Sequence, residues 1–184
     1  MAESNITKRA LAQAMKELIE EIPFEKINVG QICERCNMNR KSFYYHFRDK
    51  YDLVNWIFDT EFIAVASQKD FRTGWEFFSE LCGYLYQNRS FYLRALKIKG
   101  QNSFSDHFRE MMEPVVAEHL YGMLIEEKQV AFFVEFLTDA VVCAIERWIQ
   151  KAHCVEPEVF LVQLKECVQQ VAVKVYREMD DTAQ

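Results

Sequence analysis

Near its N-terminus the chain reads Asn28-Val-Gly-Gln-Ile-Cys-Glu-Arg-Cys-Asn-Met-Asn-Arg-Lys-Ser-Phe-Tyr-Tyr-His-Phe47. The apolar residues of this segment recur at the spacing of two short helices that cross at a tight turn: Val29, Ile32, Cys33, Cys36, Met38, Phe43 and Phe47. Asn28 and Asn39 are good N-caps for the two helices, and Asn37 is one of the few residues besides glycine that tolerate a left-handed backbone. The pattern therefore predicts a helix-turn-helix over residues 28–47.

The polar residues of the second helix fall on the face opposite its apolar side. They place hydrogen-bond donors along two turns, a length of helix that fits into the major groove of DNA: Arg40, Lys41, Ser42, Tyr44, Tyr45 and His46. From Arg35 to Lys50 there are also five basic residues and one acid. On spacing alone, the same pattern could be the solvated basic face of an ordinary helical domain.

The rest of the chain reads as further helices on both sides of this motif. Upstream, a helix is expected from Thr7 to Glu21, and downstream Asp49 caps a connector helix over residues 49–67. Further segments are expected at 73–88, at 90–99 and from 103 to 127, where Pro114 should kink or divide the helix. Two long helices, 128–152 and 157–179, follow. The prediction is an all-α protein of about nine helices.

Charge is distributed unevenly along the chain. The formal net charge of −6 would by itself argue against a nucleic-acid partner. Residues 1–50, however, hold nine Lys and Arg against seven Asp and Glu, so their net charge is +2 and that of the remainder is −8. One end of the molecule can therefore approach DNA while the rest would be repelled by phosphate.

Composition and leader signals limit the class of protein. Half of the 184 residues are hydrophobic, and only 5 are glycine and 3 are proline, which excludes disordered, collagen-like and turn-rich all-β chains. The N-terminus has no basic region followed by an apolar run, and no uncharged apolar stretch reaches the roughly 18 to 20 residues of a membrane span. We therefore expect a cytoplasmic protein without a membrane partner.

No pattern of residues indicates catalysis, a metal or a cofactor. The six cysteines are scattered and mostly lie on apolar stripes, so we expect buried thiols without disulfides. Cys33-Glu-Arg-Cys36 could be half of a zinc or redox site, but no second pair has suitable spacing. The chain has no nucleophile with a base, no phosphate-cradling glycine loop and no His-Glu-x-x-His pattern. We therefore do not expect this chain to be an enzyme.

At this point the sequence resembles the TetR/AcrR family of transcriptional regulators. Members end their helix-turn-helix in a run similar to Ser42-Phe43-Tyr44-Tyr45-His46-Phe47, and the next helix starts with a run similar to Asp49-Lys50-Tyr51-Asp52-Leu53. The likeness covers roughly residues 7–65. Asn28 stands where the family often has Thr, and Asn37 where it often has Gly. Both keep the backbone role, although Asn28 could change a phosphate contact.

Carried onto this sequence, the resemblance implies a role for each polar residue of the motif. Arg40, Lys41 and Ser42 are expected toward base edges, with Arg40 the first choice for reading a guanine. Tyr44, Tyr45 and His46 are expected against sugar and phosphate, and Lys50 is similar to a lysine that clamps the DNA backbone. The predicted DNA-binding residues are thus Asn28, Arg40, Lys41, Ser42, Tyr44, Tyr45, His46 and Lys50.

The body is more weakly similar to the subgroup of DhaS type, activators of dihydroxyacetone kinase operons. This likeness lies in Trp56-Ile57-Phe58, in the stretch from Tyr84 to Tyr92, and in Val142-Cys143-Ala144-Ile145 with Arg147. It implies a DNA-binding domain at 1–50, a sensing and dimerisation domain at 51–184, and Ω-shaped homodimers paired through the last two helices. The expected dimer-interface residues are Phe136, Ala140, Cys143, Arg147, Leu164, Val168 and Val171.

The sequence leaves open whether the regulating signal is a small molecule or a partner protein. Aromatic and methionine residues of the body could line a small-molecule effector pocket, although simple core packing is at least as good an interpretation: Trp75, Phe78, Tyr84, Tyr92, Phe104, Phe108, Met111 and Met112. In the DhaS-type subgroup the signal can instead arrive through a partner protein.

The leading hypothesis for the whole chain is a homodimeric regulator of a palindromic operator. The alternative is a helical protein-interaction adaptor or co-activator without a small-molecule effector.

Overall fold

The computed structural model describes residues 2–98, 102–120 and 127–182, and their side chains at 5–98, 102–118 and 131–170. With the continuous run from α4 to α5 counted once, these residues form nine helices, as predicted, and contain no strand. In chain order the elements are α1 Ala2–Glu21, η1 Phe24–Lys26, α2 Val29–Arg35, α3 Arg40–His46, α4 Lys50–Phe58, η2 Asp59–Ile63, α5 Ala64–Ala66, α6 Gly74–Gln87, α7 Arg89–Ala95, α8 Phe104–Leu120, α9 Glu127–Gln150 and α10 Pro157–Thr182.

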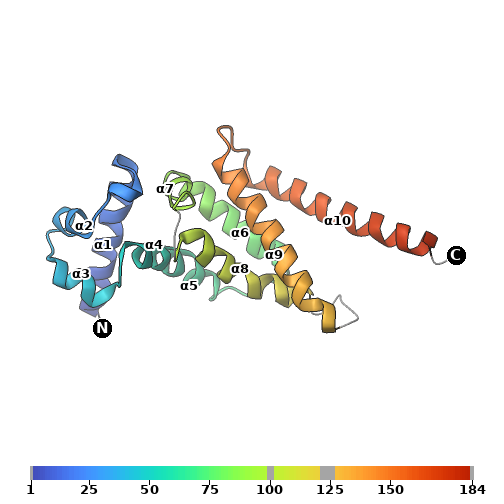
Figure 1. Cartoon of the computed structure of the whole chain (residues 1–184), viewed down its shortest axis with the longest axis horizontal. Helices are drawn as coiled ribbons and strands as arrows, with labels where there is room; N and C mark the ends of the chain where they lie inside the picture. Colours follow the sequence, from blue (N-terminus) through green and yellow to red (C-terminus); the bar gives the residue numbers. More distant parts are fainter. Residues whose placement is uncertain (1, 99–101, 121–126, 183–184) are drawn as a thin grey trace.

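Helices α1, α2 and α3 pack together at one end of an elongated molecule, and we call them the head (Figure 1). Their core contains Leu11, Met15 and Ile19 from α1, Ile32 from α2 and Phe43 from α3, all fully buried. The apolar residues of α1 recur at three- and four-residue spacing, so one side of this helix is covered by the other two. This arrangement is the predicted three-helix unit with its helix-turn-helix.

Local signals in the sequence define the two short helices of the head. Asn28 forms a capping box with Gln31: the Asn28 side chain accepts the Gln31 backbone N–H at 3.1 Å, and the Gln31 side chain accepts the Asn28 backbone N–H at 2.9 Å. Asn39 Oδ1 accepts the Ser42 N–H at 2.9 Å. Asn37 has a φ of 54°, the left-handed conformation that the turn requires. These three predictions are confirmed.

A continuous helical run from Lys50 to Ala66 connects the head to the body, within the predicted bounds of the connector. Asp49 caps it by accepting the N–H groups of Tyr51 at 2.9 Å and Asp52 at 2.8 Å. Within this run, residues Asp59–Ile63 form a π-turn, a wider turn that interrupts the regular hydrogen-bond ladder and that no residue pattern predicted.

The body consists of α6 to α10, and α8 packs along α9 (Figure 1). Helix α8 continues through Pro114 to Leu120, so of the two predicted outcomes, a kink or a division, the division is wrong. The predicted end of this segment, before residue 127, lies outside the described residues. Helix α7 ends at Ala95, earlier than predicted, and the expected stop at Gly100 lies outside the described residues. Helix α10 extends well beyond the rest of the body.

Aromatic side chains fill the space between the connector and the body. Phe58 of α4 is fully buried, and its ring contacts those of Phe104 at 5.4 Å, Phe108 at 5.6 Å and Tyr92 at 6.1 Å between centroids. These rings meet edge-on, whereas within the body Trp148 of α9 stacks on Phe160 of α10 at 4.6 Å. In the described part of the chain, no helix is long and apolar enough to cross a membrane.

Candidate nucleic-acid interface

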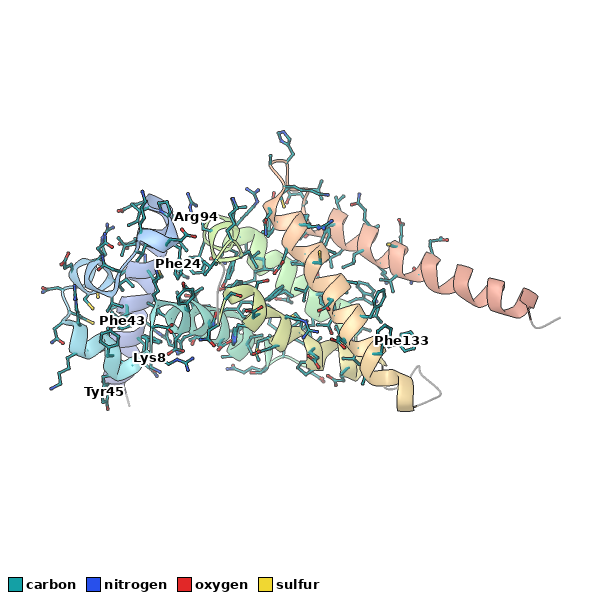
Figure 2. The ribbon with its side chains drawn as sticks, viewed as in Figure 1. Lys8, Phe24, Phe43, Tyr45, Arg94 and Phe133 are labelled. Atoms are coloured by element: carbon teal, nitrogen blue, oxygen red, sulfur yellow. The ribbon has the colours of Figure 1, made fainter. Side chains whose placement is uncertain are left out.

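Helix α3 presents two tyrosines to solvent and buries its opposite face. Tyr44 is 58% exposed and Tyr45 is 82% exposed, whereas Phe43 and Phe47 are buried in the head. Figure 2 shows Tyr45 pointing away from the molecule and Phe43 among the head's helices. Adjacent aromatic side chains that share one exposed face are a feature of interaction surfaces.

The first turn of α3 carries the predicted base-reading residues. Arg40 and Lys41 are exposed, whereas Ser42 is half-buried and its hydroxyl lies 3.2 Å from Asn39 Oδ1, so part of its hydrogen-bonding capacity serves the cap. The Arg40 guanidinium lies directly over Gly30 of α2: a Cβ atom at Gly30 would be only 2.6 Å from its Nη2. Gly30 therefore provides the space that Arg40 occupies, a role absent from the predicted set.

A shallow groove of about 460 Å³ runs between the start of α2, the exposed face of α3 and the start of α4. It brings together four of the predicted DNA-binding residues, Asn28, Arg40, Tyr44 and Lys50. Arg48 also lines this groove but was not among them. Its place in the basic stretch from Arg35 to Lys50 was a signal that could have identified it.

Lys50 is directed inward, in contrast to the other basic residues of the groove. Its ammonium donates to the carbonyl oxygens of Phe24 and Ile27, both at 2.8 Å, and lies 4.3 Å from the centre of the Phe24 ring. Burial lowers the pKa of Lys50, and the charge of Glu25 opposes this shift. Lys50 thus ties η1 to the start of the connector, while a contact to the DNA backbone stays a prediction.

The remaining residues of α3 sit at the edge of this surface. His46 is half-buried, and its ring meets that of Tyr45 edge-on at 4.9 Å. Nearby, the ammonium of Lys8 in α1 lies 5.6 Å from the ring centres of both Phe47 and Trp56. Lys8 therefore adds a positive charge where the head meets the connector.

The residues predicted for an effector pocket fall into separate groups. Tyr92, Phe104, Phe108 and Met112 are buried and lie in or beside the packed aromatic cluster around Phe58. Met111 is partly buried at the edge of the same core.

Of the other three predicted residues, Trp75 and Phe78 lie apart from this cluster, whereas the ring of Tyr84 contacts those of Tyr92 at 5.6 Å and Phe58 at 6.4 Å. Trp75 contacts the buried ring of Phe78 on α6 and the ammonium of Lys165 on α10. Tyr84 lines a hollow of about 320 Å³ between the end of the connector and α6. Other walls of the hollow include Glu61, Phe62 and Gly83. A Cβ atom at Gly83 would meet nothing within 4 Å.

The residues predicted for the dimer interface lie on outward faces of α9 and α10. Phe136, Ala140, Cys143 and Arg147 are exposed along one side of α9. On α10, Val168 is exposed and Leu164 is half-buried, while the side chain of Val171 lies outside the described residues. Phe132, four residues before Phe136, adds a further exposed apolar residue to the α9 face. On α10, Val159 and Val162 are also exposed, but on the side of the helix opposite Leu164 and Val168.

The cysteine pair of α2 belongs to the head's core. Cys33 is buried, and the Cys36 thiol donates to the Ile32 carbonyl at 3.3 Å. Burial raises the pKa of both thiols, which opposes the thiolate form that metal binding requires. No group of three or more His, Cys, Asp or Glu residues that could hold a metal ion occurs in the portion that the structure describes.

Comparison with known proteins gives matches over both parts of the chain. Residues 7–57 match the model of the bacterial regulatory proteins of the tetR family, and residues 74–170 match a transcriptional regulator C-terminal region of the same group. The HTH-type dhaKLM operon transcriptional activator DhaS of Lactococcus lactis is 26% identical over 158 residues, which are 80% of this chain and 81% of the relative.

Solved structures show the same fold. The dihydroxyacetone kinase operon activator DhaS superposes with a TM-score of 0.69 at 18% identity, over 91% of this chain and 97% of that one. A TetR transcriptional regulator from Streptococcus agalactiae superposes with a TM-score of 0.68 at 22% identity, over 88% and 93%. With both regions matched and the helix-turn-helix in place, the chain belongs to the TetR family of transcriptional regulators and has a DhaS-like body.

Proposed function

We propose that this chain binds a palindromic operator as a homodimer and controls transcription from the cytoplasm, without catalytic activity. The exposed polar face of α3 carries this proposal, because Tyr44 and Tyr45 project from it while Arg40 and Lys41 extend from its first turn. A helix with these donors matches the major groove in length and chemistry. Repression is the expected direction, and the activator named among the relatives makes activation the alternative.

Dimerisation is supported by the apolar surface of the last two helices. Phe132 is 68% exposed and Phe136 is 58% exposed on α9, and Val168 is exposed on α10. Side chains of this size on neighbouring helices are typical of a surface that a partner covers. A two-fold pairing there would set the two α3 helices about one DNA turn apart, roughly 34 to 36 Å.

Control by a signal in the body is the second part of the proposal. An effector placed among Tyr92, Phe104 and Phe108 would have to separate rings that already pack on one another. The hollow beside Tyr84 is open without such a change. The packed core is also the observation that favours the second candidate function, an adaptor or co-activator that receives its signal from a protein.

Selection of bound duplexes from a random pool, at defined salt, tests operator binding. We expect an inverted repeat, and we expect the double substitution Arg40→Ala/Tyr44→Ala to weaken its binding at least ~10-fold, because one base-reading arginine contributes about 1 to 3 kcal/mol. Arg72→Ala is the matched control, since Arg72 is 86% exposed on the body. Selection of no duplex, or equal binding by the double variant, would contradict the proposal.

A further inference from the structure

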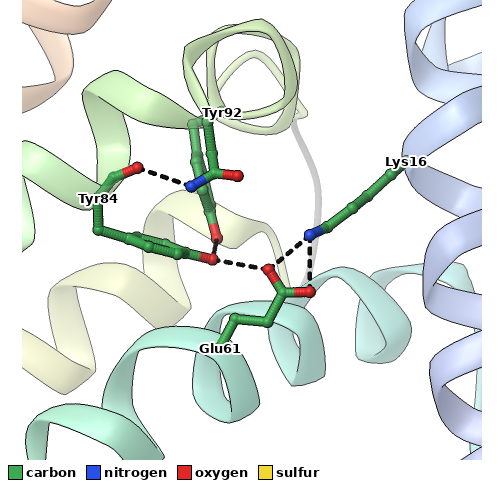
Figure 3. A network of polar contacts seen from close by, with 5 residues as sticks. Lys16, Glu61, Tyr84 and Tyr92 are labelled. Atoms are coloured by element: carbon green, nitrogen blue, oxygen red, sulfur yellow. Dashed lines mark hydrogen bonds and ion pairs between the residues drawn. The ribbon is translucent and has the colours of Figure 1, made fainter.

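Four side chains form a continuous polar chain between the head and the body (Figure 3). Lys16 of α1 lies 2.6 and 2.5 Å from the two carboxylate oxygens of Glu61 in the π-turn. The Tyr84 hydroxyl of α6 lies 3.1 Å from Glu61 and 2.8 Å from the Tyr92 hydroxyl of α7. We call these four residues the Glu61 latch.

Proton positions in the latch follow from the donors available. Tyr84 has one hydroxyl proton, and the Glu61 carboxylate can only accept, so Tyr84 donates to Glu61 and Tyr92 donates to Tyr84. Burial raises the pKa of both tyrosines above the ordinary value, which keeps their protons in place. Tyr92 is fully buried, so its hydroxyl depends on this partner. Glu61 is thereby anchored in the body on one side and holds the head on the other.

The latch acts on the part of the connector that is least regular. The π-turn at Asp59–Ile63 interrupts the helical ladder, and such interruptions are where helices bend. The same turn is held from a third direction, because His107 of α8 lies 2.6 Å from Asp59. Besides the latch, the C-terminal end of α1 meets α7, where the exposed Ser90 and Glu20 are joined by a hydrogen bond of 2.7 Å and Arg94 donates to the Glu20 carbonyl at 3.4 Å. The latch is therefore the contact that links head, π-turn and body at one point.

Resting on the operator binding proposed above, we propose that Glu61 is the positioning residue that sets the angle of the DNA-reading head relative to the body. Its carboxylate does not touch DNA. It acts through Lys16, by holding α1 at one orientation while Tyr84 and Tyr92 hold the carboxylate. A dimer with both latches closed presents its two α3 helices at one spacing, and a dimer with open latches presents a range of spacings.

Binding of protein variants to full, half-site and respaced operators distinguishes this role from a purely structural one. For Glu61→Ala we expect binding to the full palindrome to weaken about fivefold or more, with affinity for a single half-site duplex within about twofold. We expect the wild type to bind more weakly to palindromes with one base pair added or removed at the centre, and we expect the loss caused by Glu61→Ala to be smaller on these duplexes. The exchange Lys16→Glu/Glu61→Lys should recover part of the affinity, since it rebuilds the ion pair with reversed charges but leaves the Tyr84 hydroxyl without its acceptor.

Glu80→Ala is the matched control. This variant removes a carboxylate from another lysine–glutamate pair, Lys69 to Glu80 at 2.7 Å. The pair joins the link after α5 to α6 and does not involve α1. We expect its operator affinity and spacing preference to equal those of the wild type. An effect of Glu80→Ala as large as that of Glu61→Ala, or an equal loss on half-site and full palindrome, would overturn the positioning role.

Amide hydrogen exchange in the full-length, DNA-free protein provides a readout that is independent of operator binding. The peptide covering residues 55–66 should exchange about fivefold faster in Glu61→Ala than in wild type, and at a rate between the two in the Lys16→Glu/Glu61→Lys variant. Unchanged exchange in Glu61→Ala would overturn the latch even if an operator is found. If no duplex is selected, the proposed function fails, and this comparison still decides the latch.

Discussion

Lys50 offers a sharp test, because its sequence position suggests a DNA-backbone clamp while the structure gives its ammonium two close carbonyl partners. The perturbation is Lys50→Met, which keeps the length of the side chain and removes its charge and donors. The carbonyls of Phe24 and Ile27 each lose a bond of 2.8 Å. The ring of Phe24 also loses a cation at 4.3 Å.

The expected cost follows from these contacts. Hydrogen bonds to a charged group contribute about 1.5 to 3 kcal/mol each, and the desolvation that lowers the pKa of Lys50 offsets part of that gain. We therefore expect a net loss of about 2 kcal/mol in the free energy of unfolding. In a chain of this length that corresponds to a fall in Tm of about 4 to 8 °C.

Thermal unfolding and the salt dependence of operator binding, measured together, distinguish the two roles. A structural Lys50 predicts a lowered Tm and an unchanged slope of log K against log salt. Arg48, which is exposed and lines the groove, is the control, because Arg48→Met should leave the Tm unchanged and remove one phosphate-neutralising charge from each head, which reduces the slope by about two per homodimer. A Lys50→Met variant with wild-type Tm and a slope reduced by about two would refute the structural reasoning.

Three further predictions follow from single contacts. Asn37→Ala should cost about 1 kcal/mol of stability in urea unfolding, because φ is 54° there, whereas Asn37→Gly should cost nothing. The hydrogen bond to Arg35 is the main cause that lowers the pKa of Glu21 from 4.5, so Glu21 contributes stability that is present above pH 4.5 and lost as pH falls through the folded-state pKa. In Glu21→Gln, the free energy of unfolding should therefore depend less on pH in that window. Phe136→Glu should yield monomers in sedimentation, and because this side chain is 58% exposed, the fold of each monomer should keep its Tm. Persistent dimers would contradict the proposed interface.

Features of the head that depend on neighbouring residues could be predicted from the sequence. The caps at Asn28, Asn39 and Asp49 and the left-handed turn at Asn37 each involve partners within three residues. Local chemistry of this kind leaves a fixed spacing in the chain, so it can be read before the fold is known. The exposed face of α3 followed directly, because the apolar residues of the same helix define its buried side.

Features that join distant segments could not be predicted. Lys50 lies 23 residues from Ile27, and Lys16 lies 45 residues from Glu61, so no spacing rule connects the partners. The π-turn has no signature in the residues Asp59–Ile63. The aromatic residues of the body showed the same limit, because helical spacing identifies which rings face inward and cannot distinguish a packed cluster from the wall of a cavity.

Among these contacts between distant segments, the one made by Tyr84 connects an open site on the body to the orientation of the head. Tyr84 lines the hollow between connector and α6 together with Glu61, and its hydroxyl is also the body's hold on that carboxylate. A molecule or a protein side chain bound in the hollow would lie against both partners of this bond. If the occupant offered Glu61 a better donor, the carboxylate would be released from Tyr84 and the head would lose its fixed angle. A signal received at the body's surface would thereby reach the DNA-reading helix through one hydrogen bond, without opening the packed core around Phe58.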